Sequence, residues 1–284
     1  MAFILLHDGG FAMQKFSYHT HTNSFGVFDG HNSAAEMIKR AEELGFEELG
    51  ISNHLIYHAG ADVSFSPMFC NDYQKAEDLY KKTCEEIRAA AAGSRLKVRI
   101  GFEVDFFSSP AWRRDFEKLM SRLDADYYIG ASHALINHDE SRYINIYQRS
   151  AAESLDQEAL EEFLRCHWLN LIEAVNSGYF AFIAHPDVVK VFGYCLEPRW
   201  DEYKMKLVEA LAARKQPFEL NTSGWNKCGE QHPHEWMLNE LQKRNVPIVI
   251  SDDAHKVEAL GQHFERAENL LRQLNYTNRW KLSA

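Results

Sequence analysis

Short apolar runs alternate along the chain with longer segments of helical periodicity. The apolar or β-prone runs predict seven strands, at 16–18, 47–54, 97–107, 126–133, 179–187, 216–224 and 246–255. Between them, apolar spacing and capping signals predict helices near 33–44, 71–92, 110–123, 157–175, 200–214 and 262–273, with one more opened by Pro233. Ser154 and Gln157 are expected to mark the start of the helix at 157–175. Continuous apolar strands separated by helices are typical of a parallel sheet that is covered on both faces. We therefore expect an α/β protein.

The repetition of these units predicts a closed or nearly closed βα barrel. No composition shift divides 13–284, so we expect a single barrel domain there, preceded by an N-terminal extension at 1–12. An open doubly wound sheet is the alternative, but no GxGxxG follows the first strand to support nucleotide binding.

Composition and charge narrow the classes of partner. The net charge is −10 and no Lys/Arg run occurs, so a nucleic-acid groove is not favoured, whereas bound metal ions could still attract a small anionic substrate. The opening segment lacks the features of a signal peptide, and no run is long and apolar enough to predict a membrane span. Five scattered cysteines without a CxxC spacing fit a reducing compartment. We expect a cytoplasmic protein.

Chemistry-bearing residues gather at the carboxyl ends of the predicted strands. They are His19, His21, His54, Glu103, His133, His185, Asp253 and His255. In a βα barrel this face carries the active site. Singly, His185 could be a satisfied loop histidine and Asp253 a helix N-cap. Other histidines, among them His58, His167 and His232, fall on predicted helices and loops and carry no such signal.

The number of donors predicts more than one metal ion. One zinc or manganese ion takes three or four protein ligands, so this set predicts two or three clustered divalent ions (zinc, manganese or iron) with a carboxylate such as Glu103 as a bridge. Because no GxSxG motif or Ser-His-Asp set occurs, we expect metal-activated water to be the nucleophile.

Eight short motifs follow one another along the chain: HTHT at 19–22, FDGHNS at 28–33, GISNH at 50–54, GFEVDFF at 101–107, IGASH at 129–133, AHPDVVK at 184–190, ELNTSG at 219–224 and SDDAH at 251–255. In this order they resemble the PHP (polymerase and histidinol phosphatase) superfamily. The pattern is most similar to PHP-type histidinol-phosphatases. The resemblance implies a distorted (β/α)7 barrel, a trinuclear metal centre and hydrolysis of a small phosphomonoester. It favours L-histidinol phosphate as the substrate, and thus a role in histidine biosynthesis.

The resemblance also implies roles for individual residues. His19, His21, Glu103 and Asp253 would hold one ion; Glu103, His133 and His185 a second; and His54 and His255 a third, with Asp29 or His31 as the further donor. Asp253 or His255 is expected to help protonate the leaving alcohol. Asp105 matches no ligand position and is expected to be an outer partner or a loop anchor.

Two departures from the family pattern concern metal affinity and phosphate binding. Asn53 stands where the family usually has Asp, although its amide oxygen could still accept a hydrogen bond from an imidazole. The Arg that often follows the NTSG motif is absent, which leaves Lys227, Arg142 and Lys190 as phosphate candidates, each with the alternative of being an ordinary surface charge.

Three other functions remain open at this stage. The first is an enzyme of the same mechanism with another small phosphate ester as its substrate. The second is a metal-dependent amidohydrolase, against which Glu103 at the bridging position argues, since such enzymes often use a carbamylated Lys there. The third is a PHP module that only scaffolds a partner.

Overall fold

A computed structural model describes residues 13–61, 63–64, 66–137, 140, 142–147 and 152–283, so the expected extension at 1–12 lies outside the described residues. Seven parallel strands neighbour one another in chain order: β1 (Phe16–Ser17), β2 (Glu48–Tyr57), β4 (Lys97–Asp105), β5 (Tyr127–Ala131), β8 (Phe182–Ile183), β9 (Phe218–Asn221) and β10 (Ile248–Ser251). A parallel bridge between Thr20 and Ala254, with the His21 N–H donating to the Ala254 carbonyl over 2.8 Å, joins the first and last strands. The predicted barrel is confirmed.

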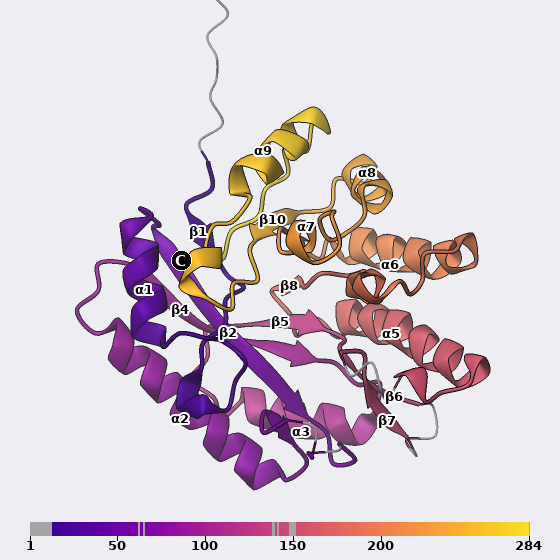
Figure 1. Ribbon diagram of the computed structural model, residues 1–284, viewed down its shortest axis with the longest axis horizontal. Helices are drawn as coiled ribbons and strands as arrows, with labels where there is room; N and C mark the ends of the chain where they lie inside the picture. Colours follow the sequence, from indigo (N-terminus) through magenta and orange to yellow (C-terminus); the bar gives the residue numbers. More distant parts are fainter. Residues whose placement is uncertain are drawn as a thin grey trace, which may run out of the picture.

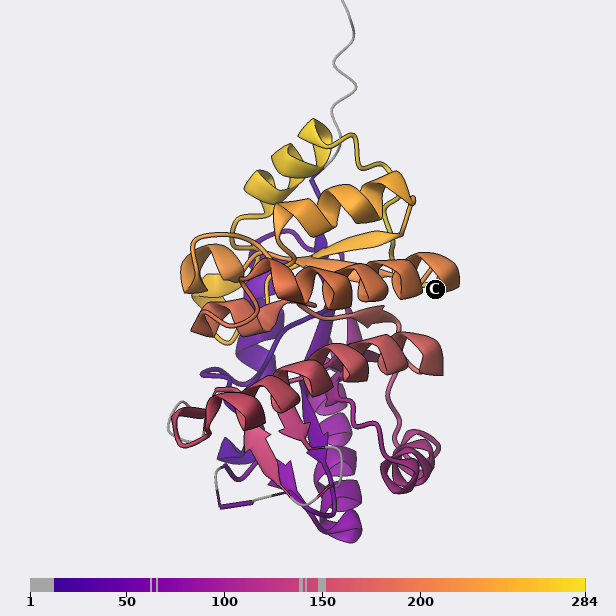
Figure 2. The ribbon, with the colours of Figure 1, turned by 90° about the vertical axis from the view of Figure 1, so that its right-hand side faces the viewer.

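Helices surround this sheet (Figure 1). They are α1 (Ala34–Glu43), α2 (Tyr73–Ala91), α3 (Pro110–Met120), α5 (Gln157–Ser177), α6 (Asp201–Arg214), the short α7 (Gly224–Lys227), α8 (Glu235–Lys243) and α9 (Phe264–Gln273). The view turned by 90° shows α5, α6, α8 and α9 stacked along one side of the barrel (Figure 2). No helix in the described part of the chain combines the length and apolarity that a membrane crossing needs.

Local sequence explains where several helices begin. Ser33 accepts the Glu36 N–H while the Glu36 carboxylate accepts the Ser33 N–H, which is the capping box expected for α1. For α5 the expected cap at Ser154 is wrong. Asp156 caps the helix by accepting the Ala159 N–H over 2.9 Å, because a carboxylate directly before the first turn satisfies a free helical N–H.

Three short strands were not predicted. The strand expected to end at His54 continues to Tyr57, where β3 (Phe69–Cys70) pairs with it. The segment after His133, where no strand was predicted, forms an antiparallel hairpin of β6 (Ala134–Ile136) and β7 (Tyr143–Asn145), which packs beside α5 (Figure 1). Strands of two or three residues are too short for a periodic signal, and they form because their side chains are buried by residues distant in sequence.

The core below the site is packed tightly around aromatic rings. A cluster of Tyr18, Tyr127, Ile129, Ala131, Phe182, Ala184 and Val249 lies apart from the larger core. A Cβ atom at Gly50 would lie 2.2 Å from the Tyr127 Oη, and one at Gly101 would lie 2.3 Å from its Cζ. Glycine is therefore required at both positions, and the packed rings form a rigid support for the strand ends.

Candidate metal centre

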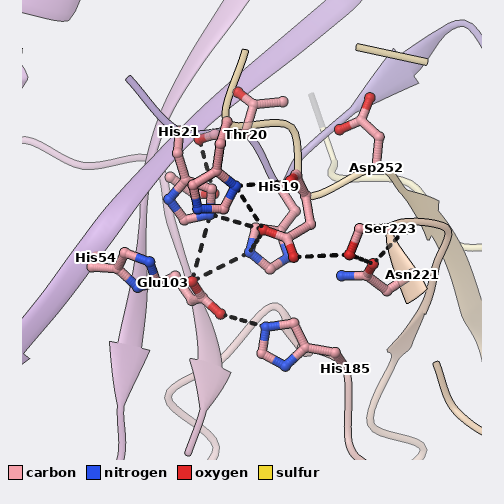
Figure 3. A network of polar contacts seen from close by, with 12 residues as sticks. His19, Thr20, His21, His54, Glu103, His185, Asn221, Ser223 and Asp252 are labelled. Atoms are coloured by element: carbon pink, nitrogen blue, oxygen red, sulfur yellow. Dashed lines mark hydrogen bonds and ion pairs between the residues drawn. The ribbon is translucent and has the colours of Figure 1, made fainter. Parts of the chain in front are cut away.

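The eight residues singled out at the strand ends meet in one place. His19 and His21 follow β1, His54 and Glu103 belong to β2 and β4, His133 and His185 follow β5 and β8, and Asp253 and His255 follow β10. Figure 3 shows the His19, His21 and His185 rings directed at the Glu103 carboxylate. Parallel strands place their carboxyl ends at the same edge, which is why residues so distant in sequence converge.

The first cluster has the dimensions of a tetrahedral metal site. His19 Nε2 lies 3.3 Å from Glu103 Oε2 and 3.6 Å from Asp253 Oδ1, and His21 Nε2 lies 3.6 Å and 3.3 Å from the same two oxygens. Metal–ligand bonds of about 2.0–2.1 Å would place tetrahedral ligand atoms about 3.3 Å apart. These four atoms are therefore spaced to hold one ion.

A second cluster forms on the other oxygen of Glu103. Glu103 Oε1 lies 2.8 Å from His185 Nε2 and 3.4 Å from His133 Nε2, and the two ring nitrogens are 3.2 Å apart. Glu103 is 1% exposed, so its carboxylate faces both clusters and little else. This is the geometry that a bridging carboxylate requires.

A third cluster involves the loop after His21. Asp29 Oδ2 lies 3.4 Å from His54 Nε2 and 3.3 Å from His255 Nε2. A Cβ at Gly30 would lie 2.4 Å from a Thr22 backbone carbon, so glycine lets this loop fold back and bring Asp29 to the rings. The side chain of His31 is exposed, and that residue contacts the site through its backbone N–H, which donates to the His255 carbonyl. The structure thus favours Asp29 over His31 as the loop donor.

Buried polar atoms without hydrogen-bond partners mark the same clusters. Among the described residues, His19 Nε2, both ring nitrogens of His21, His54 Nδ1 and both oxygens of Glu103 are buried without a hydrogen bond. Leaving such atoms unsatisfied costs about 1–3 kcal/mol each, and more for a charged group. Divalent cations would satisfy them together, and imidazole with carboxylate suits zinc, manganese or iron. The donor set fits the expected ions.

Two of the donors, Glu103 and His21, have protonation states that suit cation binding. Burial alone would raise the pKa of Glu103, but the His19, His133 and His54 rings hold it well below its ordinary value. Burial and the neighbouring His255 and His54 lower the pKa of His21 to about 3. Ionised carboxylate and neutral imidazole are the forms that bind metal.

The two consecutive aspartates after β10 serve different purposes. Asp253 faces the rings, with a left-handed backbone at φ 49° that non-glycine residues adopt only where the surroundings enforce it. Asp252 points away from the cluster (Figure 3). Its carboxylate accepts the Ser17 hydroxyl over 2.9 Å and the Gly261 N–H over 2.6 Å. Burial raises the pKa of Asp252 to about 7. Only the second aspartate is placed as a ligand.

Glu219 belongs to the site although we did not predict a role for it. Its Oε2 lies 2.9 Å from His19 Nδ1, and its Oε1 accepts the His185 N–H over 2.7 Å. A carboxylate on Nδ1 keeps the proton there and leaves the Nε2 lone pair free toward the site. The available signal was a charged residue within the apolar run 216–224, two positions before Asn221 and so on the same strand face.

Asp105 and Asn53 anchor the backbone beside the ligands. Asp105 accepts the N–H groups of His133 and Ala134, so the expected loop-anchor role is confirmed. The Asn53 oxygen, which could have accepted a hydrogen bond from an imidazole, has a different partner. That oxygen accepts the Thr22 N–H over 2.7 Å, and the Asn53 amide donates to the Thr22 hydroxyl over 2.8 Å, because the turn after His21 folds over it.

Of the three basic residues expected to bind phosphate, Lys227 reaches the site. Its Nζ lies 2.8 Å from Asp253 Oδ2, and it lines a cavity of about 260 Å³ above the clusters. Arg142 is exposed in the turn between β6 and β7 and is not among the lining residues. Lys190 lines a different cavity, where its buried ammonium donates to the Gln231 carbonyl over 2.6 Å and pairs with Asp187. The structure therefore does not place Arg142 or Lys190 at the site.

The far wall of the cavity is partly apolar. Besides the candidate ligands and Lys227, it is lined by Ile56, Ser66, Met68, Asn145 and Tyr147. These residues come from the extension of β2, the loop before β3 and the end of β7. The segments missed in the sequence thus form the wall that faces the cluster.

The amino-acid sequence matches known proteins over most of its length. The PHP domain model matches residues 17–223. A Deinococcus radiodurans protein named Probable histidinol-phosphatase is 27% identical over 261 residues, which cover 90% of this chain and 92% of that protein. The Histidinol-phosphatase of Bacillus subtilis is 24% identical over 280 residues, which cover 89% of this chain and 98% of that protein.

The fold is also found in a solved structure. Histidinol phosphate phosphatase from Lactococcus lactis, complexed with zinc, L-histidinol and phosphate, has a TM-score of 0.69 at 17% sequence identity, over 95% of this chain and 97% of that one. Its likeness shows a shared barrel. Because the PHP domain model spans well over half of the chain, the protein belongs to the PHP domain family.

Proposed function

We propose that this protein is a metal-dependent phosphomonoesterase that hydrolyses L-histidinol phosphate to L-histidinol and phosphate. The observation that carries the proposal is the convergence of three donor clusters on and around Glu103, with tetrahedral spacing in the first. Two to three divalent ions would lower the pKa of water at the site and neutralise the phosphate oxygens. The nine proposed ligands are His19, His21, Asp29, His54, Glu103, His133, His185, Asp253 and His255.

The residues around the cavity would divide the work of binding the ester. Lys227, at the cavity wall beside Asp253, would supply a positive charge to a phosphate oxygen as a point charge without the bidentate geometry of an arginine. The apolar wall of Ile56, Met68 and Tyr147 would face the organic group. Asp253 or His255, both at the cavity, would help to protonate the leaving alcohol.

The identity of the substrate is supported by the relatives. The two relatives described above are named for this activity, and each aligns with about nine-tenths of the chain. The Lactococcus structure contains L-histidinol and phosphate. The same residues speak against amide hydrolysis by a carbamylated lysine, because Glu103 occupies the bridging position. We also propose that residues 13–284 form one barrel domain, and that the enzyme works in the cytoplasm in histidine biosynthesis.

The test is phosphate release by metal-loaded protein. L-Histidinol phosphate is compared with sugar, nucleotide and amino-alcohol phosphates, and a Glu103→Gln variant serves as the inactive control. Selective turnover of L-histidinol phosphate that is lost in the variant would support the proposal. Turnover of another ester would keep the mechanism and change the substrate. No turnover of any phosphoester by metal-loaded protein would overturn it.

A further inference from the structure

His167 is a buried histidine outside the metal clusters. It lies in α5, its side chain is 0% exposed, and its ring faces two backbone carbonyl groups. The Nδ1 atom lies 3.0 Å from the Ser132 carbonyl oxygen, and the Nε2 atom lies 3.3 Å from the Pro186 carbonyl oxygen. From sequence alone His167 fell among the histidines without a functional signal, so this placement comes from the structure.

The two carbonyls belong to the loops that carry the second cluster. Ser132 directly precedes His133, and Pro186 directly follows His185. The Nε2 atoms of those two rings lie 3.2 Å apart, and both approach Glu103 Oε1. One imidazole thus spans the two loops whose separation sets the spacing of this pair of donors.

On their other sides, both loops are already fixed. The His133 N–H donates to Asp105, and the His185 N–H donates to Glu219. Those anchors tie each loop to a neighbouring strand, but neither ties one loop to the other. His167 supplies a link between them, from a helix that packs against both β5 and β8.

The chemistry of the ring suits this link. Burial lowers the pKa of His167 to about 4, so the ring is neutral at pH 7 and carries one N–H. The tautomer with its proton on Nδ1 donates to the nearer Ser132 carbonyl, and the other tautomer donates to Pro186. In either tautomer the rigid ring fills the space between the two carbonyls. An aliphatic side chain would fill part of the space and leave both carbonyls without this donor.

We propose that His167 is a positioning residue that holds His133 and His185 at the spacing needed for one ion of the cluster. The inference rests on the proposed function only in requiring that the protein binds metal. It predicts a selective effect, in which the second cluster loses affinity while the first and third clusters keep theirs.

The test compares three variants of the full chain. His167→Leu removes both hydrogen-bonding atoms, and His167→Asn keeps an amide nitrogen near the place of Nδ1. Leu171→Ala damages the same helix at another buried residue (1% exposed), one turn after His167. Metal bound per chain is measured by elemental analysis, and affinity by competition with a chelator. Thermal melting and phosphatase kinetics are recorded in parallel.

We expect His167→Leu to bind one equivalent of metal about 10- to 100-fold more weakly than wild type, with the other equivalents unchanged and kcat reduced. His167→Asn should recover part of that affinity. Leu171→Ala should melt at a lower temperature and keep the full metal complement. If His167→Leu folds poorly, the comparison of His167→Asn with Leu171→Ala decides the question by the same metal measurement.

Two results would overturn the inference. One is a wild-type metal complement and affinity in the His167 variants, and the other is an equal metal loss in Leu171→Ala, which would show a general effect of destabilising α5. If the wild-type protein binds metal, neither of these results affects the proposed function. Wild-type protein that binds no metal would overturn the proposed function itself, together with the inference.

Discussion

Replacing Glu103 by Gln tests the centre of the site most directly. The two carboxylate oxygens lie 2.8–3.6 Å from ring nitrogens of five histidines, His19, His21, His54, His133 and His185. Glutamine keeps the shape, removes the charge and replaces one oxygen by an N–H₂ group that would face a metal or an imidazole lone pair. Removing one partner from a buried charged network costs about 3–5 kcal/mol, and every 1.4 kcal/mol is a tenfold change in binding. We therefore expect metal affinity to fall by about 100- to 4,000-fold.

The assay combines metal content with thermal melting in the presence and absence of EDTA. Bound ligand at 100 times its dissociation constant stabilises a protein by about 2.7 kcal/mol, so EDTA should lower the melting temperature of wild type and leave Glu103→Gln nearly unchanged. Glu268→Gln is the matched control, because Glu268 is also a buried carboxylate but pairs with Arg279 at 2.7 Å, away from the site. Glu268→Gln should be less stable yet keep the EDTA effect. A Glu103→Gln protein that keeps all its metal and the EDTA effect would refute the reasoning.

Three further predictions address individual groups. Asp29→Asn should weaken metal binding about tenfold or more while His31→Asn leaves it unchanged, measured by chelator competition, and the reverse result would make His31 the ligand. Lys227→Met should raise the KM for the ester about tenfold, because the variant loses a charge-assisted contact with the phosphate. Lys190→Met should lower the melting temperature and leave KM unchanged. A higher KM in Lys190→Met would contradict the placement of Lys190 outside the site. Between pH 7 and 5, metal-free wild type should lose about 2 kcal/mol more stability than His167→Leu in urea unfolding. The pKa of His167 is near 4 in the folded protein and 6.5 ordinarily, so the unfolded chain takes up the proton first as the pH falls. Equal losses of stability in the wild type and in His167→Leu would contradict a buried, neutral ring.

Much of the site could be predicted from the sequence because it depends on local order in the chain. Six of the seven apolar runs end in or near a chemistry-bearing residue, as 47–54 ends in His54 and 246–255 contains Asp253 and His255. Alternation of strands and helices implies a parallel sheet, and the strands of a parallel barrel end at one face. From these two observations the convergence of the donors could be predicted without knowledge of their side-chain contacts. The same local signals located the principal helices and the seven barrel strands.

Only the tertiary structure decided the contacts between residues that no local sequence pattern connects. Glu219 meets His19 across 200 positions, and His167 reaches a carbonyl 35 residues before it and another 19 residues after it. The same holds for the basic residues, since Lys190 and Lys227 differ in where their backbones lie rather than in chemistry. The β6–β7 hairpin forms because neighbouring elements bury its few apolar side chains. Such contacts depend on the complete fold, because a side chain's partner is set by the strands and helices that surround it and not by its own segment.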